Sequence, residues 1–234
     1  MHKIDIGQAT IDAILERRGR LHFERIEPAK TALLVVDMQN SFVKKGAGHA
    51  WVPEAASIVP NINALATNLR AAGGVVVWIV TTYTGETRAN WSHFHDELWT
   101  RERSAKRAEA LSAGHPAHDL YDALEPGADD LTVHKTHYSA FIQGSSDLQD
   151  QLLQRGIENV IVTGTATNVC CESTARDAMM LNFRTIMVSD ANAAFSEEAH
   201  NATLRTFWGL FGDVQSTAEL VQVLRPAQAS EAAE

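Results

Sequence analysis

Three side chains of this 234-residue sequence have the types needed for cysteine-based chemistry. They are Asp37, Lys135 and Cys170. Each lies a short distance after a β-branched run that is typical of a buried strand. A cysteine is a nucleophile only as its thiolate, so it needs a nearby proton acceptor, a cation or a helix N-terminus. We therefore predict that Asp37 is an acid, Lys135 a cation that positions the base, and Cys170 a thiol nucleophile.

Asp37 directly follows the apolar run at residues 33–36, which favours burial of its carboxylate. A buried carboxylate near a thiol is a candidate general base. The alternative is a carboxylate that caps a turn or pairs with a surface lysine. Lys135 also follows a strand pattern, and although most lysines are solvated, the aromatic and small residues at 138–141 are typical of a pocket floor.

The two cysteines, Cys170 and Cys171, follow a buried-strand pattern at residues 159–163 and a turn at 164–168. A helix pattern comes next, and the first turn of a helix favours a thiolate and can bind an oxyanion. At helical spacing Cys171 shares its face with a mostly apolar stripe, whereas Cys170 shares its face with polar residues. We expect Cys171 in the core and Cys170 in the cleft, with simple packing of both thiols as the alternative.

Short β-branched runs alternate with longer helical patterns, which is typical of an α/β protein with a mostly parallel sheet. In such a sheet, ligands bind at the carboxyl ends of the strands, beside the point where strand order reverses. Six strands are expected at residues 32–36, 75–80, 131–133, 159–163, 185–188 and 213–215, and helices at 58–72, 146–155, 169–182, 197–210 and 217–224.

The remaining segments lie outside this alternation. Residues 81–127 are too long for an ordinary connection, and we interpret them as a lid or pocket wall. Residues 1–30 are expected to form a helical extension, with one amphipathic helix at 7–18. A single domain is predicted over 31–225, followed by a disordered tail at 226–234.

Composition excludes several classes of function. A formal charge of −9 and scattered basic residues argue against nucleic-acid binding. The longest apolar runs are far too short to span a bilayer, so no membrane association is expected. The only two cysteines are adjacent, which fits a reducing compartment, and we predict a cytoplasmic protein.

Three ordered motifs resemble the isochorismatase-like cysteine hydrolases. They are TALLVVDMQN at residues 31–40 with Phe42, KTHYSAF at 135–141, and VTGTATNVC at 162–170 followed by STARDA at 173–178. The resemblance covers about residues 29–224 and implies a three-layer sandwich, in which helices flank a six-stranded, mostly parallel sheet.

The same resemblance implies a reaction and assigns roles to residues. The reaction would be hydrolysis of a small non-peptide amide through a thioester acyl-enzyme, with no cofactor. Asp37 would be the base, Lys135 the supporting cation and Cys170 the nucleophile. The amides of Ala166 and Cys170 would form the oxyanion hole, with a cis bond between Thr165 and Ala166.

Departures from the family pattern narrow the choice of activity. Members that hydrolyse isochorismate lack the thiol, so the presence of Cys170 argues against that activity here. Nicotinamidases of the family hold a metal through an Asp-x-His pair and a further His, whereas residues 46–54 offer only His49 here. His93 and His95 are a weak alternative pair, so we expect no metal.

The turn and the helix that follows it look most like ureidoacrylate amidohydrolases and N-carbamoyl amide hydrolases. A small ureido or carbamoyl amide is then the expected substrate, with release of ammonia. For Phe42 and Trp91, aromatic core packing is an alternative at least as probable as a substrate contact. For the arginines, a solvated basic face is an equal alternative. The candidates for substrate contacts are Phe42, Tyr83, Trp91 and Tyr138, and those for a substrate carboxylate are Arg88, Arg101, Arg103 and Arg107.

Two other functions stay open at the level of sequence. One is a metal-dependent nicotinamidase, and the other is a noncatalytic protein that keeps the fold. The resemblance and the extra N-terminal helix also suggest a homodimer or homotetramer.

Overall fold

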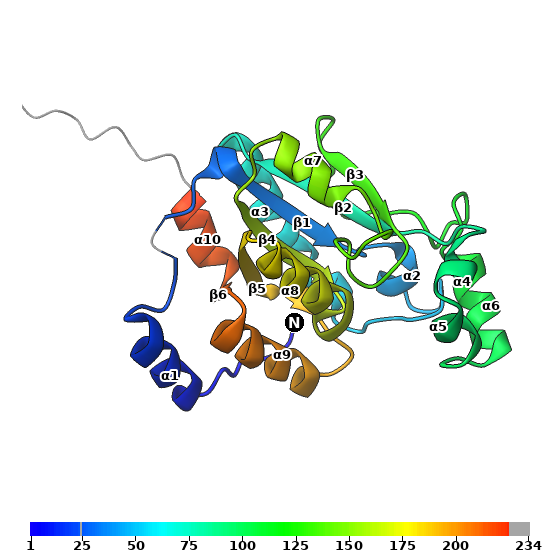
Figure 1. The fold of residues 1–234 in the computed structure, drawn as a ribbon, viewed down its shortest axis with the longest axis horizontal. Coiled ribbons are helices and arrows are strands. Elements are labelled where there is room, and N and C mark those ends of the chain that lie inside the picture. The colour runs from blue at the N-terminus through cyan, green and yellow to red at the C-terminus, as the bar shows by residue number, and fades with distance from the viewer. Residues whose placement is uncertain (24, 225–234) are drawn as a thin grey trace, which may run out of the picture.

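Six strands form the central sheet of the computed structural model, in the order β3-β2-β1-β4-β5-β6 (Figure 1). The structure describes residues 1–23 and 25–224, so the tail predicted at 226–234 lies outside the described residues. All five strand pairings are parallel. The strands are β1 (Thr31–Val36), β2 (Val75–Thr81), β3 (Leu131–Lys135), β4 (Asn159–Thr165), β5 (Arg184–Ala193) and β6 (Asp213–Gln215).

The sheet is covered on both faces, because alternate residues of its strands enter two separate apolar clusters. In the fully buried β1, Leu34 and Val36 join one cluster, while Leu33 and Val35 join the other. One face is covered by α7 (Leu148–Gln154), α8 (Glu172–Met180) and α9 (Glu197–Leu210), and the other by α3 (Val59–Ala71) and α10 (Thr217–Leu224). The expected three-layer α/β architecture is confirmed.

Three strands extend by two or more residues beyond the carboxyl ends that their sequence patterns predict. β3 continues to Lys135 because that residue still pairs with Thr81 of β2. β4 continues to Thr165, and β5 to Ala193, because these two residues pair beyond an irregularity in the β4–β5 ladder. Polar and glycine residues at a strand end weaken the local pattern, but a neighbouring strand can still hold them in the sheet.

The long segment at 81–127 contains three helices beyond the carboxyl ends of the central strands (Figure 1). They are α4 (Thr87–Asn90), α5 (Ser92–Asp96) and α6 (Arg101–Ala110). The short α2 (Asn40–Val43) and the 3-10 turn η2 (Ala55–Ile58) follow β1.

The N-terminal helix α1 (Gln8–Arg18) packs against α9 of its own chain, beside the sheet (Figure 1). Its Ile14 is fully buried, and Arg18 Nη2 donates to the Gly212 carbonyl at 2.7 Å. A 3-10 turn, η1 (Pro28–Lys30), leads into β1. Among the described helices, none has the length and apolar character needed to cross a bilayer.

Candidate active site

The site lies where the strand order reverses, between β1 and β4. The chain proceeds from β1 toward β2 and β3 on one side, and from β4 toward β5 and β6 on the other. The residues that leave these two strands therefore face a crevice at the carboxyl edge of the sheet. Asp37 leaves β1, Ala166 leaves β4, and Lys135 ends β3 two strands away.

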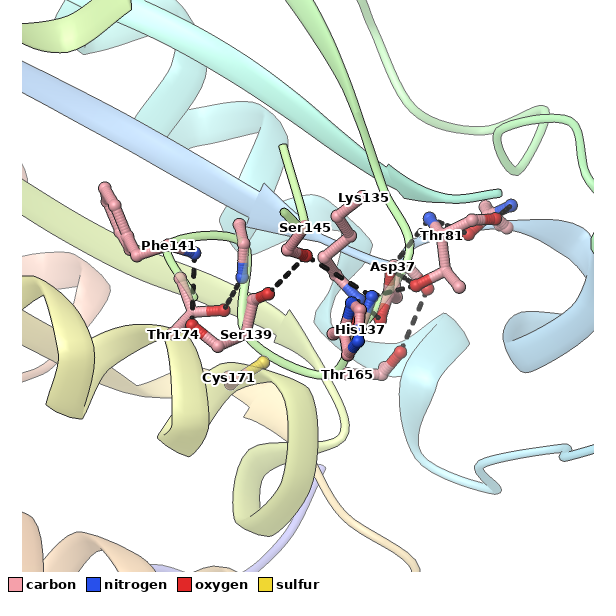
Figure 2. Close-up of polar contacts among 12 residues, drawn as sticks. Asp37, Thr81, Lys135, His137, Ser139, Phe141, Ser145, Thr165, Cys171 and Thr174 are labelled. Carbon is pink, nitrogen blue, oxygen red and sulfur yellow. Dashed lines mark hydrogen bonds and ion pairs between the residues drawn. The ribbon is translucent and has the colours of Figure 1, made fainter. Parts of the chain in front are cut away.

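Asp37 is fully buried and has a left-handed backbone, with φ of 52°, a conformation that Asp tolerates better than most residues. Its Oδ1 accepts hydrogen bonds from the Thr81 backbone N–H at 3.1 Å and the Thr81 hydroxyl at 2.7 Å. Its Oδ2 lies 2.9 Å from Lys135 Nζ (Figure 2). The carboxylate is thus fixed by two neighbouring strands.

Lys135 is also fully buried, and its ammonium group makes three hydrogen bonds. It donates to Asp37 Oδ2, to Thr81 Oγ1 at 2.5 Å and to the His137 carbonyl at 3.1 Å (Figure 2). Burial opposes the charge, but the attraction of the Asp37 carboxylate and its hydrogen bond outweigh burial and raise the pKa of Lys135. The side chain is a fixed cation beside the carboxylate.

Thr81 and Gln39 complete this network, and sequence reasoning missed both. Gln39 Oε1 accepts from the Thr81 N–H at 2.9 Å, and Gln39 Nε2 donates to the carbonyls of Thr81 and His118 at 3.1 and 2.8 Å. The signal for Thr81 was a polar residue at the carboxyl end of an apolar run. The signal for Gln39 was its place two residues after Asp37 in the same motif.

The turn after β4 brings the cysteines to this edge of the sheet. The Thr165–Ala166 peptide bond is cis, as expected from the family resemblance. Thr165 Oγ1 donates to the Asp37 carbonyl at 3.0 Å (Figure 2). A wide π turn, η3 (Thr167–Cys171), comes before α8, so helical structure begins two residues before the predicted start at 169, whereas the α-helix itself begins three residues after it. Such turns recur at functional sites.

The two cysteines have different environments. Cys170 lines the cavity beside Thr81, whereas Cys171 is fully buried with its thiol 3.8 Å from the Thr163 carbonyl. Burial and the neighbouring Asp37 carboxylate raise the pKa of the Cys170 thiol to about 12, although Lys135 and Arg107 oppose this increase. The helix position and the cation were expected to lower the pKa of this thiol, but burial and the carboxylate outweigh them.

A cavity of about 630 Å³ opens over Cys170 and Ala166. Phe42 and Tyr138 line it, as predicted for substrate contacts, and Trp51 and Phe195 add further aromatic surface. The π turn and the segment at 81–127 supply much of the remaining wall, so that segment is a pocket wall.

Tyr83 and Trp91 do not line this cavity, so their prediction as wall residues needs correction. The Trp91 ring stacks on Phe94 at a centroid distance of 3.9 Å and meets Tyr138 edge-on at 5.1 Å. The Tyr83 ring lies edge-on to His95. Both rings pack with Phe94 and His95 in an aromatic layer behind the cavity wall. From this layer Trp91 contacts Tyr138.

The four candidate arginines separate in the structure. Arg103 and Arg107, both on α6, line the cavity together with Lys106 and Glu102. Arg88 pairs with Asp96 at 2.6 Å in an exposed position, and Arg101 is exposed and outside the cavity wall.

His93 and His95 do not form a pair. The His93 side chain is 89% exposed and lies 2.6 Å from Glu97, whereas His95 is buried in the aromatic layer. Among the described residues, no group of three or more His, Cys, Asp or Glu is arranged to hold a metal. His49 lines the cavity as a single neutral side chain, because burial and the charges of Arg107 and Lys106 lower its pKa to about 3.

Comparison with known proteins gives consistent matches. Residues 31–219 match the family described as "Isochorismatase domain". The ureidoacrylate amidohydrolase RutB of Pseudomonas syringae pv. syringae is 34% identical over 215 residues, which cover 86% of each chain. RutB of Klebsiella pneumoniae is 31% identical over 215 residues, covering 85% of this chain and 90% of that protein.

Solved structures show the same similarity. A cysteine hydrolase from Pseudomonas syringae pv. phaseolicola superimposes with a TM-score of 0.75 at 32% identity, covering 88% of this chain and 97% of that chain. N-carbamoylsarcosine amidase from Thermoplasma acidophilum superimposes with a TM-score of 0.62 at 26% identity, covering 80% of this chain and 96% of that chain.

Proposed function

The chain belongs to the isochorismatase family, and on that premise we propose that it is a cysteine-dependent amidohydrolase. It cleaves a C–N bond of a small non-peptide ureido or carbamoyl amide and releases ammonia. The observation that carries the proposal is the meeting of Asp37, Lys135 and Cys170 at one buried edge of the sheet, beneath a cavity of small-molecule size. The names of similar proteins support the choice of amide.

The resting site holds its negative charge on Asp37 and a proton on Cys170. The raised pKa keeps the thiol protonated at neutral pH. A thiol next to a carboxylate can lose its proton as the sulfur approaches a carbonyl carbon, so proton transfer to Asp37 and attack occur together. Lys135 stays charged throughout and stabilises whichever neighbour is anionic.

Acylation then forms one bond and breaks another. The sulfur adds to the carbonyl carbon, and the backbone amides of Ala166 and Cys170 bind the resulting oxyanion. The C–N bond breaks, and the leaving nitrogen takes the proton from Asp37 to depart as ammonia. A ureido substrate leaves a thiocarbamate on the sulfur, and a simple amide leaves a thioester.

Deacylation uses the same groups in reverse. Asp37 removes a proton from water, the hydroxide adds to the acyl carbon, and the sulfur leaves and regains that proton. A ureido substrate yields a carbamic acid, which decomposes to an amine and carbon dioxide. No step requires a redox or organic cofactor, and we expect none.

The proposal is tested by ammonia release from ureido acids, N-carbamoyl amino acids, biuret, nicotinamide and simple primary amides. We expect release from at least one ureido or carbamoyl compound, loss of that release in Cys170→Ala, and its retention in Cys171→Ala, which removes the neighbouring core thiol. Turnover of nicotinamide alone would favour the nicotinamidase alternative. Release that survives in Cys170→Ala would refute the thiol mechanism.

Two properties accompany the proposal. We propose that the enzyme is cytoplasmic and forms a homodimer or homotetramer. Light scattering after size-exclusion chromatography distinguishes these assemblies from a monomer of 25.6 kDa.

A further inference from the structure

Arg107 is a buried cation in the wall of the cavity that holds Cys170. It lies in α6, its residue is 8% exposed, and its side chain lines the cavity. Burying a guanidinium without an anionic partner is costly, so arginines in such positions normally pair with a carboxylate or phosphate. Arg107 therefore needs a charge partner.

No carboxylate among the described residues pairs with Arg107. Its Nη1 donates to His49 Nε2 at 3.4 Å, and its guanidinium lies 4.9 Å from the Phe94 ring centroid. Its buried Nε has no hydrogen-bond partner within the described part of the chain. Burial lowers the pKa of Arg107, because the guanidinium loses hydration there.

His49 does not supply the missing negative charge. Because Arg107 Nη1 can only donate, His49 Nε2 is the acceptor, and the ring proton is on Nδ1. Nδ1 then donates to Ser41 Oγ, 3.0 Å away. His49 is thus a neutral ring that orients the guanidinium from one side and leaves its charge uncompensated.

The other groups near Arg107 do not compensate it in the resting site either. Tyr138 and Cys170 are neutral, since burial raises the pKa of both groups. Asp37 already pairs with Lys135. The remaining charged residues of the cavity wall are Glu102, Arg103 and Lys106, so cations outnumber acids there.

We propose that Arg107 binds a carboxylate of the substrate, so that the enzyme selects ureido or carbamoyl acids over neutral amides. This inference rests on the proposed function for the reacting carbamoyl end of the substrate. It adds a carboxylate at the other end of the substrate. The carboxylate occupies the unpaired side of the guanidinium while the carbamoyl carbon faces Cys170. The exposed Arg103 and Lys106 attract the anion to the cavity.

The experiment measures binding without turnover. Isothermal titration calorimetry on Cys170→Ala uses ω-ureido acids with two to four carbons, and the methyl ester of each acid as its uncharged match. The same titrations are made on Cys170→Ala/Arg107→Met and on Cys170→Ala/Arg101→Gln. Arg101 is the matched control, because it is an exposed arginine of the same helix outside the cavity wall.

We expect at least one acid to bind about 30-fold or more tightly than its ester in Cys170→Ala, as for a buried charged hydrogen bond. Arg107→Met should remove that preference, and Arg101→Gln should retain it. Because Arg107 lacks a carboxylate partner, Arg107→Met should keep the melting temperature of its parent or raise it, whereas a structural arginine would lower it.

Equal binding of acid and ester in Cys170→Ala, or no binding of any acid, would overturn the inference without any need for the arginine variant. An equal loss of both ligands in Arg107→Met would also overturn it. The proposed function is judged separately by ammonia release in wild type. Binding of acids through Arg107 without turnover would refute the function and leave the anion site standing.

Discussion

Lys135 Nζ lies 2.9 Å from Asp37 Oδ2, and both side chains are fully buried. A buried ion pair contributes little net stability, but the loss of one partner leaves a desolvated charge. Lys135→Met should therefore reduce the free energy of unfolding by about 3–5 kcal/mol. Urea denaturation measures this loss.

The double variant Asp37→Asn/Lys135→Met is the control. It removes both charges, so it should be more stable than Lys135→Met alone while remaining inactive. If the two substitutions destabilised the protein additively, the two charges would not be coupled, and the role given to Lys135 would be wrong.

The reactivity of Cys170 should follow its raised pKa. With a pKa of about 12, the thiolate fraction increases about tenfold for each pH unit across the range in which the protein is handled. The rate of alkylation by iodoacetamide should therefore keep rising from pH 7 to pH 9.5. It should not level off near the ordinary cysteine pKa of about 8.5. Mass spectrometry of the peptide that carries both cysteines follows the reaction.

Cys171 is the internal control for this labelling. Its thiol is fully buried and its pKa is also raised, so Cys170 should be modified first. A plateau below pH 8 would show that Cys170 is a resting thiolate, and the coupled proton transfer to Asp37 would have to be abandoned.

The Thr81 hydroxyl connects the acid to the cation, since it donates to Asp37 and accepts from Lys135. Thr81→Val keeps the shape but removes both hydrogen bonds. Hydrogen bonds to charged groups contribute about 1.5–3 kcal/mol each, so kcat/KM should fall about 10- to 100-fold. Steady-state ammonia release measures the change.

The neighbouring Thr82 provides a matched control for this substitution. Its hydroxyl bonds to His118 and His134, at 2.8 and 2.7 Å, outside the network of Asp37. Thr82→Val should keep kcat/KM within about twofold of wild type, as is usual for substitutions away from buried networks. Equal losses in the two variants would assign the effect to the strand end as a whole.

The sequence could predict the fold and the reacting groups because both depend on local patterns. Apolar runs identify the strands, and a polar residue directly after such a run lies at the edge of the sheet, as Asp37 does. Cys170 and Cys171 could be separated by helical spacing alone. The cis bond at Thr165–Ala166 required the family resemblance, since no local pattern indicates it.

The features that were missed depend on contacts between distant segments. Arg107 and Arg101 belong to the same basic helix, and only the folded cavity wall shows which one is buried. Trp91 and Phe42 are equally plausible wall residues by type, but α5 brings Phe94 against Trp91 and places that ring behind Tyr138. Burial also reversed the expected direction of the Cys170 pKa.

Gly164 joins the fold to the site, because β4 approaches β1 closely at this residue. Its φ is +112°, and a Cβ added there would collide with the backbone of Val36, which precedes Asp37. Gly164→Ala should therefore push the two strands apart, reduce the free energy of unfolding by about 3 kcal/mol and lower kcat by displacing Asp37.

Gly209→Ala is the matched control, since a Cβ at this α9 residue meets no described atom within 4 Å. It should be neutral or stabilising by up to about 1 kcal/mol. If Gly164→Ala were as stable and as active as Gly209→Ala, close contact of β1 and β4 would not be needed to hold the carboxylate in place.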